Sequence, residues 1–103
     1  MSELLTTARP YAKALFKSAK EKNMLEQYSG VLNNLNVVVN EPNIKKILLN
    51  DSFDNKYKAN VISEILKDVL DENFSRFITL LTENNRLFVV SEIMDLYEIY
   101  LQE

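Results

Sequence analysis

The sequence predicts an all-α protein, an antiparallel bundle of six helices joined by short turns. Of its 103 residues 47% are hydrophobic, and the apolar positions recur at the 3.6-residue period of a helix. The chain has only one Gly and two Pro, which leaves few residues that favour turns. A chain of this length can build one hydrophobic core, so we expect a single domain over residues 1–103.

The first helix is expected to begin after Ser2, a suitable N-cap, and to continue to about Lys20. Pro10 within it predicts either a kink or a fresh helix start capped by Thr7. One line of side chains on this helix is assigned to the core: Leu5, Ala8, Ala12, Leu15 and Ala19. A neighbouring line is assigned to the wall of a groove: Leu4, Thr7, Tyr11, Ala14 and Ser18. A third line is basic and expected to face water: Arg9, Lys13, Lys17 and Lys20.

The second helix is expected over about residues 24–39, where Gly30 suggests the close approach of another helix. Its apolar stripe comprises Leu25, Tyr28, Leu32, Leu35, Val38 and Val39. Pro42 ends this helix, because the residue before a proline is pushed out of the helical region. The same proline begins a short third helix that ends at Leu49. The inward side chains of this third helix are Ile44, Ile47 and Leu48.

The fourth helix is expected to be capped by Ser52 or Asp54 and to continue to about Val69. Its apolar pattern comprises Tyr57, Val61, Ile62, Ile65 and Leu66. The fifth helix opens with the charges of Asp71 and Glu72 and ends at residues 84–85. Its core line comprises Phe74, Phe77, Ile78 and Leu81, with Leu80 outside that line.

The sixth helix is expected over about residues 87–102, with a wide apolar strip. The strip comprises Val89, Val90, Ile93, Leu96, Tyr97, Tyr100 and Leu101. Acidic side chains on the same helix are expected to point outward: Glu92, Asp95 and Glu98.

The composition removes the commonest catalytic and metal-binding groups, because the chain has no Cys and no His. It contains no phosphate-binding loop, dinucleotide fingerprint or serine-elbow pattern. Asp51 with Asp54, or Asp71 with Glu72, could form paired carboxylates, but each pair lies where a helix must start. We interpret them as helix caps and first-turn charges, and we expect no catalytic residue, no cofactor and no metal.

The net charge of −3 disfavours a nucleic-acid binder, although the basic line of the first helix leaves a small helical regulator of nucleic acid as an alternative. Binding through phosphates would weaken steeply with salt, whereas binding in an apolar groove would not. An enzyme that uses tyrosine and carboxylates is a third hypothesis, for which no nucleophile and base can be named. No apolar run approaches the roughly 20 residues that span a bilayer, and no signal-peptide pattern opens the chain.

Two separated segments resemble one known family. The segment ARPYAKALF over residues 8–16 is similar to the opening helix of the delta subunit of F-type ATP synthases, the bacterial relative of mitochondrial OSCP. The segment TENNRL over residues 82–87 resembles the ENGRL turn of that family. The family usually has Gly at the position of Asn85, where a left-handed residue closes the helix, and Asn is the next most suitable residue there. The resemblance covers the family's N-terminal domain, and we expect its second, membrane-proximal domain to be absent.

The resemblance implies a non-catalytic stator component that links the catalytic head to the peripheral stalk during proton-driven ATP synthesis. In the delta family, the groove between the first and fifth helices receives the N-terminal helix of an alpha subunit. The matching positions here are Leu4, Thr7, Tyr11, Ala14, Ser18, Phe77, Leu80 and Leu81. The resemblance also implies a contact with the peripheral-stalk b subunit through the second domain and no nucleic-acid partner. It places the protein at the cytoplasmic face of the bacterial inner membrane, attached only through the complex.

Overall fold

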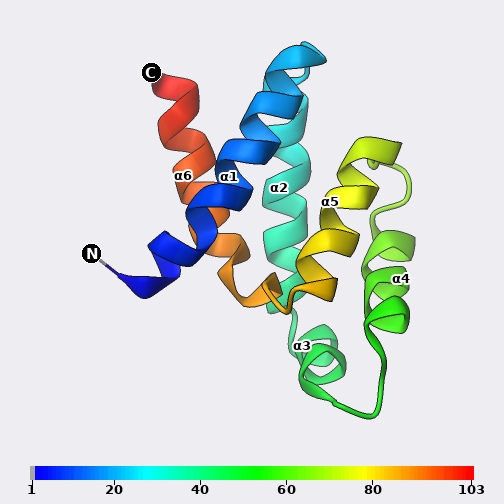
Figure 1. Ribbon diagram of the computed structural model, residues 1–103. Helices are drawn as coiled ribbons and strands as arrows, with labels where there is room; N and C mark the ends of the chain where they lie inside the picture. The colour runs from blue at the N-terminus through cyan, green and yellow to red at the C-terminus, as the bar shows by residue number, and fades with distance from the viewer. Residues whose placement is uncertain (1) are drawn as a thin grey trace.

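A computed structural model describes residues 2–103 (Figure 1). Within this range the chain forms six α-helices and one short 3₁₀-helix, and it has no strand. In chain order the elements are α1 (Glu3–Glu21), α2 (Leu25–Asn40), α3 (Pro42–Leu49), α4 (Asn55–Ile65), α5 (Glu72–Glu83), η1 (Leu87–Val89) and α6 (Val90–Gln102). The predicted all-α bundle of six helices with short turns is confirmed.

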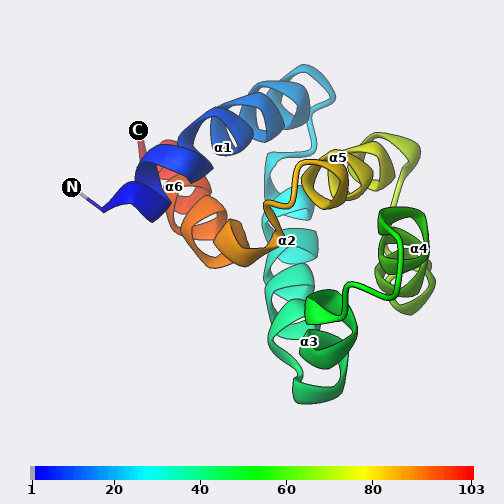
Figure 2. The same cartoon turned by 60° about the horizontal axis from the view of Figure 1, so that its bottom comes forward.

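The helices form two packed groups that meet at α2. α1 packs chiefly on α6, and α6 also packs on α2, while α4 and α5 form the second group. α3 contacts α2 near the C-terminal end of α2. Figure 2 shows α3 and α4 on the same side of α2. α5 runs in the opposite direction to α1 (Figure 1), so their two surfaces can form a shared face.

The core is one cluster of buried apolar side chains from both groups. The predicted core line of α1 is confirmed, since Ala8, Ala12, Leu15 and Ala19 are buried and Leu5 is half-buried. Each alanine side chain is a single methyl group, so the backbone of α1 can lie close to the helices that pack against it. This packing fixes α1 on α6 and leaves its other side open.

Helix α1 continues without interruption through Pro10, so the alternative of a fresh start capped by Thr7 is wrong. Ser2 caps the helix instead, and its hydroxyl oxygen accepts hydrogen bonds from the amides of Leu4 and Leu5 at 3.0 and 3.4 Å. Proline removes one hydrogen bond of the helix ladder, while the remaining bonds and the buried alanines hold the backbone in the helical conformation.

Helices α1 and α5 end in the same way, with an asparagine in the left-handed region. Asn23 has φ 57° and Asn85 has φ 56°. After Asn23 the amide of Met24 donates to the carbonyl of Ala19 at 2.8 Å, and after Asn85 the amide of Arg86 donates to the carbonyl of Leu81 at 2.8 Å. These bonds are typical of the Schellman motif. The left-handed conformation expected at Asn85 is confirmed, and that of Asn23 was not anticipated.

The prediction of a close helix contact at Gly30 is wrong. Gly30 is exposed, and a Cβ atom built on it would contact nothing within 4 Å. The glycine therefore weakens α2 without allowing closer packing.

Helix α4 is shorter than predicted, and its buried side differs from the expected one. It ends at Ile65 rather than near Val69, and residues 66–69 form turns. Tyr57 and Ile65 are 46% and 51% exposed, while Ala59, Ile62 and Leu66 are buried. The helix lies at the edge of the bundle, where only one side of it is covered.

Helix α6 differs from its prediction at two points. Residues Leu87–Val89 form a 3₁₀ turn before the α-helix begins at Val90. Glu98 does not point freely outward, because its half-buried carboxylate accepts a hydrogen bond from the Ser29 hydroxyl of α2. Of the apolar strip, Val89, Val90, Ile93, Leu96 and Tyr97 are buried as predicted.

Candidate partner-binding face

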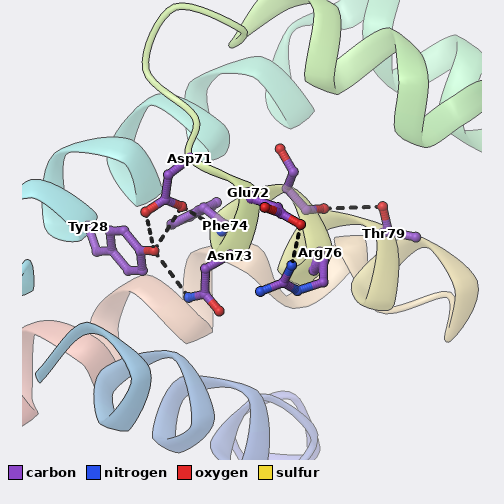
Figure 3. Close-up of polar contacts among 8 residues, drawn as sticks. Tyr28, Asp71, Glu72, Asn73, Phe74, Arg76 and Thr79 are labelled. Carbon is purple, nitrogen blue, oxygen red and sulfur yellow. Dashed lines mark hydrogen bonds and ion pairs between the residues drawn. The ribbon is translucent and has the colours of Figure 1, made fainter. Parts of the chain in front are cut away.

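The first turn of α5 is held by the Tyr28 side chain of α2 (Figure 3) and by the Ser18 side chain of α1. The Asp71 carboxylate caps α5 by accepting a hydrogen bond from the Phe74 amide at 2.8 Å. Its two oxygens lie 2.8 and 2.7 Å from the Tyr28 hydroxyl. The Asn73 side-chain amide donates to the Tyr28 hydroxyl at 3.1 Å and to the Ser18 hydroxyl of α1. The start of α5 is thereby fixed against both helices.

Protonation states in this network follow from burial and hydrogen bonding. Burial raises the pKa of Tyr28 to about 12, and the hydrogen bond to Asp71 acts in the same direction. Burial alone would raise the pKa of Asp71, but hydrogen bonds from Tyr28 and from the Phe74 amide outweigh it and lower the pKa of that carboxyl. At neutral pH the phenol is therefore a donor and the carboxylate a charged acceptor.

One carboxylate of each candidate pair serves as a helix cap, as interpreted from the sequence. Asp54 accepts a hydrogen bond from the Tyr57 amide at 2.8 Å at the start of α4, as Asp71 does at the start of α5. Glu72 forms an ion pair with Arg76 at 2.9 Å, one turn further along α5. Each of these carboxylates has a structural partner.

The other end of α5 is also tied to α1. The Asn84 side-chain amide donates a hydrogen bond to the Tyr11 hydroxyl at 3.0 Å. Together with the Ser18–Asn73 bond, it joins the two helices at two points. Tyr11 precedes Ser18 in α1, whereas Asn84 follows Asn73 in α5, so the helices are antiparallel where they meet.

Between the two bridges, α1 and α5 present apolar side chains that are open to solvent. Ala14 lies one turn from Tyr11 and is exposed, and Leu80 lies one turn before Asn84 and is 45% exposed. Leu4 is also exposed, at the first turn of α1. We define the α1–α5 face as the following residues: Leu4, Thr7, Tyr11, Ala14, Ser18 and Leu80.

Two residues predicted to bind a partner lie beneath this face. Leu81 has 0% of its surface exposed, so it cannot contact a bound helix, and that prediction is corrected. Phe77 is buried apart from a small exposed part. Phe77 and Leu81 belong to the buried side of α5, so their side chains point into the bundle, whereas Leu80 lies on the exposed side of the same helix.

Comparison with known proteins relates this arrangement to one family. Residues 7–103 match the family model described as ATP synthase delta (OSCP) subunit. The chain belongs to the ATP synthase delta (OSCP) subunit family. This is a family of structural, non-catalytic subunits of ATP synthase.

Curated relatives carry the same name. ATP synthase subunit delta of Marinomonas sp. (strain MWYL1) is 38% identical over 97 residues, which are 94% of this chain and 54% of that protein. The protein of the same name from Psychromonas ingrahamii is 39% identical over 97 residues, again 94% of this chain and 54% of the relative. The one from Alcanivorax borkumensis is 37% identical over 103 residues, 100% of this chain and 58% of the relative. The chain thus spans a little over half the length of these delta subunits.

Across residues 2–103, no three His, Cys, Asp or Glu side chains are grouped so that they could hold a metal ion. None of the helices in the described part of the chain combines the length and the apolar character needed to cross a membrane.

A cavity of about 330 Å³ lies away from the α1–α5 face, between α2, α3, α4 and the turn that follows α5. The sequence did not predict it, because its lining comes from six separate elements and no single helix carries a recognisable pattern for it. The one available signal was Lys58, a charged residue on the buried side of α4.

Proposed function

We propose that this chain is a stator component of ATP synthase and that its α1–α5 face binds the N-terminal helix of an alpha subunit of the catalytic head. Membership of the delta family supports the first part of the proposal. The second part rests on one observation: apolar side chains are held partly exposed on two helices that two side-chain hydrogen bonds join, one at each end of α5.

The face has the properties needed to receive an amphipathic helix. Exposed Leu80 and the ring of Tyr11 offer apolar surface, whose burial stabilises a complex by about 25 cal/mol per Å². Ala14, one turn along α1 from Tyr11, is small and exposed and lets a guest helix approach closely. The bridges from Ser18 and Tyr11 to α5 hold the two walls in place before binding, so little order has to be gained when a partner docks.

The remaining contacts of the subunit belong to the same proposal. The longer delta subunits extend beyond the part that this chain matches, and we assign the contact with the peripheral-stalk b subunit to that further part. Attachment to the complex would then hold the chain at the cytoplasmic face of the bacterial inner membrane. A link of this kind resists rotation of the head and performs no chemistry.

Titration of the ¹⁵N-labelled chain with a peptide that copies the alpha N-terminal helix tests the binding site. The expected result is saturable shifts of amide signals from the α1–α5 face, with little change at salt concentrations that weaken phosphate binding. Shifts confined to the basic line Arg9, Lys13, Lys17 and Lys20, or to another part of the bundle, would contradict the proposal.

A further inference from the structure

We propose that the outward side of α4 docks a second copy of this chain, whose own α4 packs antiparallel against the first. The surface is a row of apolar side chains four residues apart, which we define as the α4 line: Phe53, Tyr57, Val61, Ile65 and Val69. Figures 1 and 2 both place α4 at the edge of the bundle far from α1. The α4 line shares no residue with the α1–α5 face, so the inference does not depend on the proposed function.

The α4 line is open to solvent although it is apolar. Tyr57, Ile65 and Val69 are 46%, 51% and 46% exposed, and Phe53 and Val61 are half-buried. The rings of Phe53 and Tyr57 pack on each other with centroids 4.7 Å apart, so the apolar surface extends past the start of the helix. Residues four apart are neighbours on a helix, and a contiguous apolar row of this kind marks an interaction surface more than single exposed side chains do.

An open hollow lies beside the C-terminal half of the α4 line. Val61 and Ile65 line it, together with Leu70 and with Ser75 of α5, and its volume is about 840 Å³. Tyr57 lies outside this lining, two turns before Ile65 on the same helix. When two copies of α4 pack antiparallel about a two-fold axis near Val61, each Tyr57 comes opposite Ile65 of the other copy. Each copy then supplies one exposed ring and one hollow to receive a ring.

The net charge of this surface suits a second copy. Residues 53–69 carry three basic and three acidic side chains, so their net charge is zero and two copies meet without net repulsion. The basic ones are Lys56, Lys58 and Lys67, and the acidic ones are Asp54, Glu64 and Asp68. A neutral apolar surface gives neither a strongly acidic nor a strongly basic partner an electrostatic advantage.

The order of the charges along α4 favours the antiparallel orientation. Exposed Lys56 directly precedes Tyr57. Exposed Glu64 directly precedes Ile65. Packing Tyr57 against Ile65 of the other copy therefore brings each Lys56 near Glu64 of the other copy, whereas parallel helices would bring the two Lys56 side chains together. The antiparallel arrangement also places opposite ends of the two helix dipoles side by side.

Both charged groups are available for such a contact. Lys56 forms no ion pair with any residue in the described range 2–103. Glu64 pairs with Lys67 at 3.0 Å, but their side chains are 74% and 64% exposed, and ion pairs of such exposure contribute little. An interface of one short helix from each copy lies at the small end of specific interfaces, so we expect a dissociation constant on the order of 100 µM.

Sedimentation velocity and ¹⁵N NMR spectra over a dilution series test the association of the chain with itself. Between about 10 µM and 1 mM the average mass should rise towards that of two chains, with amide shifts confined to the α4 line and the hollow. A monomer at about 1 mM overturns the inference. So does a dimer whose shifts lie at the α1–α5 face, or a chain that remains monomeric and shows α4 shifts only with phospholipid vesicles, since that surface would then meet a membrane.

A charge swap tests the orientation. Lys56→Glu should raise the dissociation constant at least about fivefold, because it places like charges together at two symmetric points. Combining Lys56→Glu with Glu64→Lys should restore the association, since the same pairs form with their signs exchanged. Lys46→Glu, at an exposed position of α3, is the matched control and should have no effect. An unaffected Lys56→Glu variant, or a double variant as weak as the single one, would overturn the antiparallel arrangement.

A second pair of variants tests the apolar contact. Tyr57→Ser removes the ring that enters the hollow and should weaken the association at least about tenfold. Val37→Ser changes an apolar residue of α2 that is 70% exposed and lies outside the α4 line, and it should leave the association unchanged. Thermal melts of dilute samples establish that both variants are folded. Equal effects of the two substitutions would show that the association is unspecific and would overturn the inference.

Discussion

The Tyr28 hydroxyl lies 2.8 and 2.7 Å from the two carboxylate oxygens of Asp71, and so it joins the middle of α2 to the N-cap of α5. The Tyr28 ring is buried and stands edge-on to the ring of Phe74, with centroids 5.1 Å apart. One carboxylate thereby caps a helix and anchors that helix to the core.

This carboxylate should make stability depend on acid pH. Hydrogen bonds from Tyr28 and the Phe74 amide hold the pKa of Asp71 below its ordinary value of 3.8 in the folded chain, despite the opposing effect of burial. Its contribution to the free energy of unfolding is therefore complete above about pH 5 and is lost as pH falls through the lowered pKa. Asp71→Asn retains a capping side chain but has no carboxylate to titrate.

We expect the difference in unfolding free energy between the original chain and Asp71→Asn to shrink as pH falls from about 6 towards 2. Urea unfolding at a series of pH values measures it. A difference that stays constant over this range would show that the carboxylate charge does not act through the Tyr28 hydrogen bond.

Two tyrosines of α6 should respond oppositely to the loss of their hydroxyl groups. The Tyr97 hydroxyl donates to the carbonyl of Leu25 at 2.7 Å, whereas the buried Tyr100 hydroxyl has no hydrogen-bond partner among residues 2–103. Tyr97→Phe should cost about 1 kcal/mol, and Tyr100→Phe should be neutral or slightly stabilising because it removes a buried unsatisfied group. Thermal melts of the two variants compare them directly, and equal losses would contradict the assignment.

The left-handed residue after α5 predicts a clear order of substitutions. Asn85 has φ 56°, so Asn85→Gly should be neutral or stabilising, while Asn85→Val should destabilise by about 1–2 kcal/mol because a β-branched residue resists positive φ. Asn23→Gly, at the matching position after α1, should behave like Asn85→Gly. Chemical denaturation gives the order, and a Val variant as stable as the Gly variant would be inconsistent with the observed conformation.

Gly30→Ala should stabilise the chain by about 1 kcal/mol. The added Cβ meets no atom within 4 Å, so the substitution gains helix propensity without a steric cost. The shift of the urea midpoint at unchanged slope measures the effect. Destabilisation would mean that α2 needs glycine at this position for a reason that its surroundings do not show.

The proposed partner site predicts variants that lose binding but remain folded. Leu80→Asp places a carboxylate on a surface open to water, where it is solvated in the unbound chain but must lose water when an apolar helix docks. Tyr11→Asp does the same at a half-buried position, and it costs more stability because it also removes a ring that packs against the core and the hydrogen bond from Asn84. Each should weaken binding of the alpha N-terminal peptide by at least about tenfold while most of the thermal stability remains.

Three controls accompany these variants. Phe77→Asp and Leu15→Asp put a charge into the core and should unfold the chain, because both side chains are buried. Val37→Asp changes an exposed apolar residue of α2 outside the face and should alter neither folding nor binding. Full peptide affinity in the folded Tyr11 and Leu80 variants would place the partner site elsewhere.

The local features of this fold follow from the sequence alone. Ser2, Asp54 and Asp71 cap helices because their side chains accept hydrogen bonds from amides that have no partner within the helix. Pro42 begins α3, and Asn85 closes the end of α5. These features depend on a few neighbouring residues, so the residue types suffice to predict them.

Burial at the edge of the bundle, in contrast, was decided by the tertiary structure. Periodicity identified an apolar stripe on α4 but not that Tyr57 would remain exposed, because the stripe is wider than the neighbouring helices cover. Gly30 lies in open space for the same reason: burial depends on which helices are adjacent.

The α1–α5 face shows the same division. The α1 side of the α1–α5 face was predictable, since small, aromatic and basic residues follow separate lines of one helix. Its bridges at Ser18 and Tyr11, and the cavity around Lys58, join residues far apart in the chain. The periodicity of a helix determines which side chains share a line on it. Only the packing of helices against one another determines which lines meet, and this information is not contained in any one segment.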